Sequence, residues 1–161
     1  MKTLIVYYSL NGNTEYAVGR IAEKTGADTL RVEPKRKYPK KGFMKFLVGG
    51  RSVMKGDKPE LMPYSVDLDE YERVVIASPI WASYYAPPIA TFISENAGVL
   101  KGKPIAYIFS SAGGDTVKAV EKLKKELHID SFFLELSLVD PKTRPSEENE
   151  RRMAEFIEKL L

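Results

Sequence analysis

One short stretch near the N-terminus, residues 6–14, constrains the fold more than any other. An apolar, β-branched run over residues 3–8 ends in a cluster of hydroxyl and amide side chains around a single glycine. Apolar residues then recur at helical spacing, at positions 16, 17, 18, 21 and 22. This order predicts a strand, a tight polar turn and a helix N-terminus. Because a helix N-terminus carries unpaired N–H groups and a partial positive charge, the turn is suited to bind a phosphate group.

The polar turn limits which kind of phosphate loop it can be. It consists of Ser9, Leu10, Asn11, Gly12, Asn13 and Thr14. Its hydroxyl and amide side chains add donors, and it has no Lys or Arg, so we expect dipoles alone to hold the phosphate. It lacks both the Gly-Lys-Ser/Thr ending of a P-loop and the three glycines of a dinucleotide fingerprint. A capped surface turn of any α/β protein remains the alternative.

The order of elements predicts an α/β fold. We expect strands over residues 3–8, 28–33, 73–78, 104–110 and 132–139, and helices over 13–25, 87–97, 115–127 and 146–160. The third and fourth strands are nearly continuously apolar, as buried parallel strands are. Alternating strands and helices favour a doubly wound sheet of five parallel strands, in the order 2-1-3-4-5, with helices on both faces. In that order the ligand site lies at the carboxyl ends of strands 1 and 3.

Length and composition narrow the class of protein. At 161 residues and 43% hydrophobic content, we expect a single domain over residues 1–161. No apolar run approaches the ~20 residues that span a bilayer. We expect no signal peptide, because the first strand begins at the N-terminus, and hence a cytoplasmic protein. The chain has no cysteine and one histidine, His128, so thiolate and metal chemistry are not expected.

The loop after the third strand gathers bulky aromatic side chains. It runs through Pro79, Ile80, Trp81, Ala82, Ser83 and Tyr84, and Trp81 is the single tryptophan of the chain. Large aromatic groups at the ligand edge are costly to expose unless something stacks on them. We therefore expect a planar ligand here. The alternative is that Trp81 packs under the following helix.

The loop after the fourth strand is built from small residues. It contains Ser111, Ala112, Gly113 and Gly114. Small side chains allow a planar ligand to approach the backbone closely, and glycine permits positive φ. An ordinary glycine-rich turn with Asp115 as the helix N-cap is the alternative.

Taken together, the three loops resemble those of the flavodoxin family. The turn reads S-L-N-G-N-T, similar to the family's T/S-x-T/S-G-x-T, with Asn11 in place of a hydroxyl residue. Ser78-Pro79-Ile80-Trp81 is similar to the loop of short-chain relatives that flanks the flavin. The resemblance covers nearly the whole chain. It implies noncovalent FMN, with the phosphate on residues 9–14, the ring beside residues 79–84 and 111–114, and no catalytic side chain.

The family often stacks a Tyr on the flavin from the loop after the fourth strand, where this chain has none. Either Tyr84 or Tyr85 takes that place, or one face of the flavin is more open, which would leave room for hydride transfer. Other proteins of this topology do not fit. A receiver domain needs an Asp where Ser78 stands, and a low-molecular-weight tyrosine phosphatase needs a Cys nucleophile.

Positive charge is concentrated in one segment, residues 35–58. It has nine Lys or Arg against Asp57 alone, a net charge of +8 in a chain whose total is +3. Apolar residues at 43, 44, 46, 47 and 48 indicate a short helix docked on the sheet. We expect the segment to steer an acidic redox partner, near Lys35, Arg36, Lys40 and Lys41, or to hold a nucleotide phosphate. A solvated Lys-rich loop is the alternative, and nucleic acid is not expected because the aromatic residues are not interleaved with the cations.

Two classes of function follow. The favoured one is an FMN-binding electron carrier that shuttles electrons between redox partner proteins, as a monomer or weak dimer. The other is a small FMN-dependent reductase that takes hydride from NAD(P)H and reduces a quinone or similar acceptor. A flavodoxin-like domain without flavin is a third, less favoured reading.

Overall fold

Five parallel strands form the sheet of this computed structural model, which describes residues 1–41 and 43–161, without the side chains of Phe43 and Phe46. The strands are β1 (Thr3–Tyr7), β2 (Asp28–Arg31), β3 (Arg73–Trp81), β5 (Ile105–Ser111) and β6 (Leu134–Val139). Their order is β2-β1-β3-β5-β6, which confirms the predicted 2-1-3-4-5 order of parallel strands. A short strand that was not predicted, β4 (Tyr84–Tyr85), pairs antiparallel with the end of β3.

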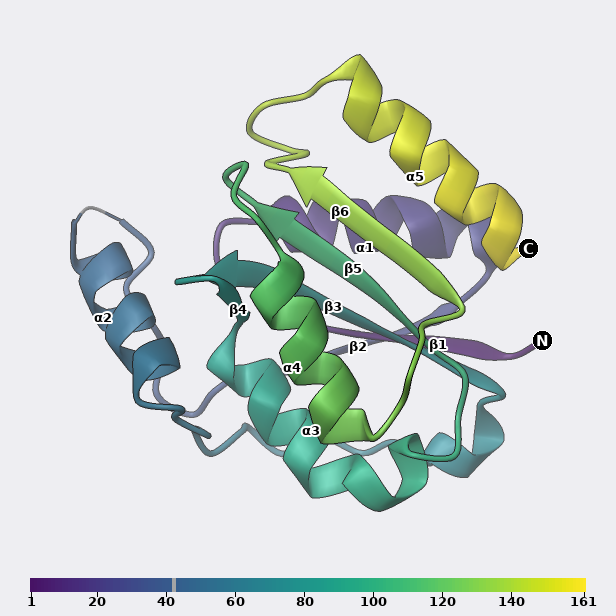
Figure 1. Ribbon diagram of the computed structural model, residues 1–161, viewed down its shortest axis with the longest axis horizontal. Coiled ribbons are helices and arrows are strands. Elements are labelled where there is room, and N and C mark those ends of the chain that lie inside the picture. The colour runs from purple at the N-terminus through teal and green to yellow at the C-terminus, as the bar shows by residue number, and fades with distance from the viewer. Residues whose placement is uncertain (42) are drawn as a thin grey trace.

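Helices cover both faces of the sheet. They are α1 (Asn13–Thr25), α2 (Phe43–Met54), α3 (Pro87–Leu100), α4 (Val117–Leu127) and α5 (Glu147–Leu160), with a 3-10 turn at Leu68–Glu70. Figure 1 shows α3 and α4 in front of the sheet and α1 behind it, and α5 packs on α1 and β6. In the described part of the chain, no helix is long and apolar enough to cross a membrane.

The central strand shows why its sequence is apolar throughout. Val74 and Ile76 belong to the core under α3 and α4, whereas Val75 and Ala77 belong to the core under α1 and α5. All four side chains are fully buried. Because successive side chains of a strand point to opposite faces, a strand covered on both sides needs apolar residues at every position.

The α2 helix is the one predicted in the basic segment, but it packs at the end of the sheet. Figure 1 shows α2 beyond the carboxyl end of β3, outside the layers formed by the other helices. Gly49 makes the approach possible: a Cβ at this position would lie 3.3 Å from Cε3 of Trp81. The side chains of Phe43 and Phe46, part of the predicted apolar pattern, lie outside the described set. The helix therefore forms a wall beside the predicted ligand edge.

Candidate functional site

A cleft of about 570 Å³ lies at the carboxyl edge of the sheet, between the loops that follow β1, β3 and β5. Of the predicted site residues, the cleft is lined by Ser9, Leu10, Asn11, Asn13, Thr14, Pro79, Ile80, Trp81, Ala82, Ser111 and Ala112. The remaining predicted residues lie in the same loops outside its lining: Gly12, Ser83, Tyr84, Gly113 and Gly114. The three loops thus converge on one hollow, as the parallel strand order requires.

The turn after β1 is held in shape by Ser9. Its Oγ accepts hydrogen bonds from the backbone N–H of Gly12, at 3.2 Å, and of Glu15, at 3.3 Å. Arg31 donates to the Ser9 carbonyl oxygen at 3.1 Å. The side chain of Thr14 is 1% exposed, and its Oγ1 has no hydrogen-bond partner. The turn therefore presents a helix N-terminus and one buried, unpaired hydroxyl to the cleft.

Asn13 has a structural task that its residue type did not reveal. Its Oδ1 accepts from the backbone N–H of Lys142 at 2.9 Å and of Thr143 at 3.1 Å. Its Nδ2 donates to Asp140 Oδ1 at 3.4 Å and to Thr143 Oγ1 at 3.2 Å. Since both amide hydrogens are used, this side chain joins the β1–α1 turn to the β6–α5 loop rather than offering a free donor.

The expectation that dipoles alone hold a phosphate needs correction, because a lysine from a distant loop lies against the turn. Gly12 has φ +91°, and a Cβ built there would lie 3.0 Å from Nζ of Lys142. A side chain at this position would therefore be strained and would also displace the lysine. The turn has no cation of its own, but the fold supplies one beside it.

The loop after β3 is a tight hairpin. Ile80 pairs with Tyr85 and Trp81 with Tyr84, which leaves Ala82 and Ser83 as a two-residue turn with φ +46° and +73°. Two-residue hairpins favour positive φ at both central positions, usually with Asn or Gly. Ala and Ser carry a Cβ, so this turn is strained at the mouth of the cleft.

The base of this hairpin is pinned by Ser78, which is fully buried. Its Oγ donates to the Pro79 carbonyl oxygen and accepts from the Ala86 N–H, both at 2.8 Å. The hydroxyl therefore joins the two ends of the loop, and Ser78 holds the position of residues 79–81 at the cleft.

Trp81 belongs to an aromatic cluster. Its ring centroid lies 5.7 Å from that of Tyr8 and 5.2 Å from that of Tyr38, both edge to face. It therefore packs against Tyr8, which directly follows β1, and against the basic segment, not under α3, and part of its surface lines the cleft. Tyr84 and Tyr85 instead lie beside Lys122 of α4, whose Nζ is 5.6 and 4.8 Å from their ring centroids.

The carboxyl end of β5 supplies a second unpaired hydroxyl. Ser110 is 4% exposed, and its Oγ has no hydrogen-bond partner. Gly113 adopts φ +114°, as predicted for a turn that needs glycine. Arg144 Nη2 donates to the Ala112 carbonyl oxygen at 2.7 Å, so the β6–α5 loop steadies the loop after β5 as well.

Five residues that line the cleft were missed by the sequence reasoning: Lys45, Gly50, Ser110, Asp140 and Thr143. Asp140 and Thr143 follow β6, whose carboxyl end is next to that of β5, so the parallel order was a usable signal. The carboxylate of Asp140 forms an ion pair with Arg144 at 2.9 Å, which offsets negative charge in the cleft. Lys45 and Gly50 come from α2, and no local pattern places that helix at the cleft.

Residues 2–159, nearly the whole sequence, match the Flavodoxin family. This chain belongs to the flavodoxin family. No curated protein matches the sequence.

Solved structures of similar fold agree with this membership. A flavoprotein from Lactobacillus acidophilus, solved in complex with FMN, is 23% identical, with a TM-score of 0.71 over 88% of this chain and 95% of that one. The two-electron reduced flavodoxin of Megasphaera elsdenii is 16% identical, with a TM-score of 0.62 over 98% and 97%. The oxidised flavodoxin 1 of Bacillus cereus is 15% identical, with a TM-score of 0.57 over 99% and 97%.

In this flavodoxin-family chain, the cleft lies where the strand order reverses, between β1 and β3. Open parallel sheets bind ligands at that switch point, because the loops after the two strands diverge there toward opposite faces. Two further elements line the cleft: α2 on one side and the β6–α5 loop on another.

Proposed function

We propose that this chain binds FMN noncovalently in the cleft and carries electrons between redox partner proteins. Family membership and the likeness to a flavoprotein solved with FMN support the proposal. The cofactor supplies the redox chemistry, and the protein binds it and tunes its surroundings.

The observation that carries the proposal is a pair of buried hydroxyls without partners, Thr14 Oγ1 and Ser110 Oγ, in the same cleft. They are the two such side-chain atoms in the part of the chain that the structure describes. A buried, unpaired hydroxyl costs about 1–3 kcal/mol, so both are poised to bond a polar ligand. Thr14, at the N-terminus of α1, suits the phosphate of FMN.

The remaining residues fit the other parts of the cofactor. The partly exposed face of Trp81 offers a stacking surface for the ring, and Ser111 and Ala112 lie where its polar end would approach. Lys142 places a positive charge beside the phosphate turn. The cleft volume of about 570 Å³ falls within the range of ligand pockets, about 300–1,000 Å³.

Calorimetry on protein stripped of cofactor tests the proposal. FMN should bind more tightly than FAD, because one turn accommodates one terminal phosphate, and FMN should give the protein a flavin absorption spectrum. No binding of FMN, or tighter binding of FAD, would refute the assignment.

For the redox partner we propose an acidic protein docking near Lys35, Arg36, Lys40 and Lys41. Lys40 and Lys41 are exposed, whereas Lys35 is already paired with Glu60, so the other three should dominate. Replacing Lys40 and Lys41 by Ser should slow electron transfer at low salt. Added salt should slow electron transfer by the wild type in the same way, once the electrostatic screening length falls below ~8–10 Å. Salt-independent transfer would exclude this surface.

A second candidate function, an NAD(P)H-dependent reductase, is favoured by the positions of Tyr84 and Tyr85. Both lie toward α4, and among side chains that the structure describes, Trp81 is the one aromatic group lining the cleft. That arrangement supports the more open flavin face on which hydride transfer depends. Turnover of NAD(P)H and a quinone by the isolated protein, at about 10 per second or faster, would decide for the reductase.

A further inference from the structure

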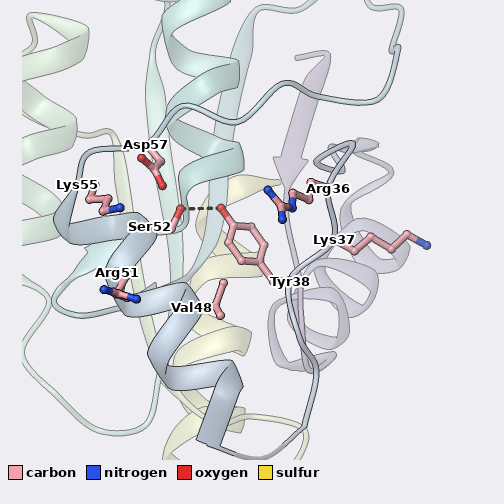
Figure 2. A pocket seen from close by; sticks show the side chains of 8 residues that line it. All are labelled: Arg36, Lys37, Tyr38, Val48, Arg51, Ser52, Lys55 and Asp57. Carbon is pink, nitrogen blue, oxygen red and sulfur yellow. Dashed lines mark hydrogen bonds between the residues drawn. The ribbon is translucent and has the colours of Figure 1, made fainter.

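A second hollow, of about 550 Å³, lies on the far side of α2 from the cleft. Its walls are the segment of residues 36–38 and the C-terminal half of α2 (Figure 2). Its lining consists of Arg36, Lys37, Tyr38, Val48, Arg51, Ser52, Lys55 and Asp57, which we call the anion pocket. None of these residues was assigned to the cofactor.

The anion pocket holds an excess of positive charge. Four of its side chains are cationic and one, Asp57, is a carboxylate. Within the described chain, none of the four cations forms an ion pair, whereas the nearby Arg31 and Lys35 are paired with glutamates. Figure 2 shows Arg36 on one side of the Tyr38 ring, Arg51 of α2 and Lys55 just after α2 on the other, and Lys37 pointing away. Three cations thus line one hollow and give it a positive potential that attracts an anion.

The pocket also has an apolar, aromatic wall. The ring of Tyr38 and the side chain of Val48 lie between the cations (Figure 2). Tyr38 is fixed in place, because its hydroxyl hydrogen-bonds Ser52 Oγ at 2.9 Å and its ring packs on Trp81. A rigid ring beside arginine forks suits a ligand with a planar group and a phosphate, since arginine matches phosphate bidentately.

We propose that the anion pocket binds a nucleotide, with its phosphates on Arg51 and Lys55 and its base against Tyr38. This site is separate from the flavin cleft, so the proposal does not depend on FMN binding. The volume of the pocket, like that of the cleft, lies in the range of small-ligand sites.

The two sites share a wall, which gives the nucleotide a built-in reporter. Gly50 of α2 lines the cleft, whereas its neighbours Arg51 and Ser52 line the anion pocket. Tyr38 lines the anion pocket, and Trp81, whose ring is 5.2 Å away, lines the cleft. Because Trp81 is the single tryptophan, a nucleotide against Tyr38 should change the tryptophan emission of the protein.

Calorimetry with ADP and adenosine, at constant ionic strength, tests the proposal. ADP should bind. Adenosine should bind at least roughly tenfold more weakly than ADP, because it lacks the charged phosphates. The double variant Arg51→Ser/Lys55→Ser should weaken ADP by roughly tenfold or more for the same reason. The matched control is Lys24→Ser/Lys118→Ser, which removes two exposed lysines of α1 and α4 and should leave ADP binding unchanged.

FMN titration of the same variants separates this site from the cleft. Arg51→Ser/Lys55→Ser should leave FMN affinity unchanged, and saturating FMN should not displace ADP. Equal losses in both double variants would show a general effect of net charge and overturn the proposal. Displacement of ADP by FMN, or no ADP binding together with binding of a polyglutamate peptide that needs Arg51 and Lys55, would overturn it too. Binding of the peptide without binding of ADP would assign this hollow to the protein-docking surface.

Discussion

Replacing Thr14 by Val should stabilise the flavin-free protein while weakening its hold on FMN. The Thr14 side chain is 1% exposed and its Oγ1 has no partner, so folding buries a hydroxyl without compensation. Valine has nearly the same shape and no hydroxyl, and its helix propensity is close to that of threonine. The two effects have opposite signs because the Thr14 hydroxyl destabilises the flavin-free protein, where it has no partner, but donates a hydrogen bond when FMN is bound.

The magnitudes follow from the burial. An unsatisfied buried hydroxyl costs about 1–3 kcal/mol, so the free energy of unfolding should rise by about 1 kcal/mol, or ~2–4 °C in Tm. A hydrogen bond to a charged group contributes about 1.5–3 kcal/mol, so FMN affinity should fall by roughly tenfold to a hundredfold. Riboflavin lacks the phosphate, and its affinity should change little.

Urea unfolding of the flavin-free protein and calorimetry with both flavins measure these effects, with Thr91→Val as the control. Thr91 is also buried, but its Oγ1 donates to the Pro59 carbonyl oxygen at 2.7 Å. The same substitution there should lower the free energy of unfolding by about 1 kcal/mol or more and leave FMN affinity unchanged. If Thr14→Val destabilises as Thr91→Val does, or weakens FMN and riboflavin equally, the reasoning about this hydroxyl is wrong.

Three further predictions test other parts of the structure. FMN should quench the emission of Trp81, and Trp81→Ala should weaken FMN by about 1–3 kcal/mol on the scale of base–aromatic stacking; unchanged emission at saturation would assign Trp81 to packing alone. Ser83→Gly should raise Tm by ~2–4 °C, because a residue at φ +73° pays about 1–2 kcal/mol that glycine avoids; a lower Tm would show that the turn is unstrained. Burial raises the pKa of Tyr107 to about 12 from an unfolded value near 10. The unfolded state therefore loses its proton first, and stability falls between these pH values by up to about 1.4 kcal/mol per pH unit. Tyr107→Phe should make that fall shallower in urea unfolding, and an identical pH dependence would contradict the shifted pKa.

The sheet was predictable because its signals are local. The apolar runs around Ile76 and Ile108 are long enough to identify buried parallel strands, and the polar turn before α1 marks a strand-to-helix junction. The order 2-1-3-4-5 is one of the doubly wound orders that right-handed crossovers allow, and the structure confirms it. The end of β3 was harder to predict, because the hairpin to β4 depends on positive φ at Ala82 and Ser83. Ala and Ser are not residue types that indicate such a turn.

The three loops of the cleft were predictable for the same reason, since each follows a recognisable strand. What the sequence could not give was which distant side chains meet them. The Asn13 amide lies in the phosphate turn, yet its hydrogen bonds go to residues 140–143. The positive charge beside Gly12 comes from Lys142. The predicted order places β6 beside β5 and so brings this loop to the cleft, but no spacing in the sequence specifies which of its side chains meet the turn.

The α2 helix links the two hollows in a way that fits its composition. A helix that packs on a sheet by one face usually carries bulky apolar residues on that face. The centre of α2 instead has two glycines, Gly49 and Gly50. Gly49 lets the backbone reach the ring of Trp81, and Gly50 lines the cleft. The next residue, Arg51, turns into the anion pocket. Because one helix backbone touches both sites through consecutive residues, a bulkier side chain at position 49 would push α2 away from Trp81 and shift a wall of each hollow. Gly49→Ala, whose Cβ would meet the ring at 3.3 Å, should therefore change the affinities for both ADP and FMN, whereas Arg51→Ser/Lys55→Ser should change the affinity for ADP alone.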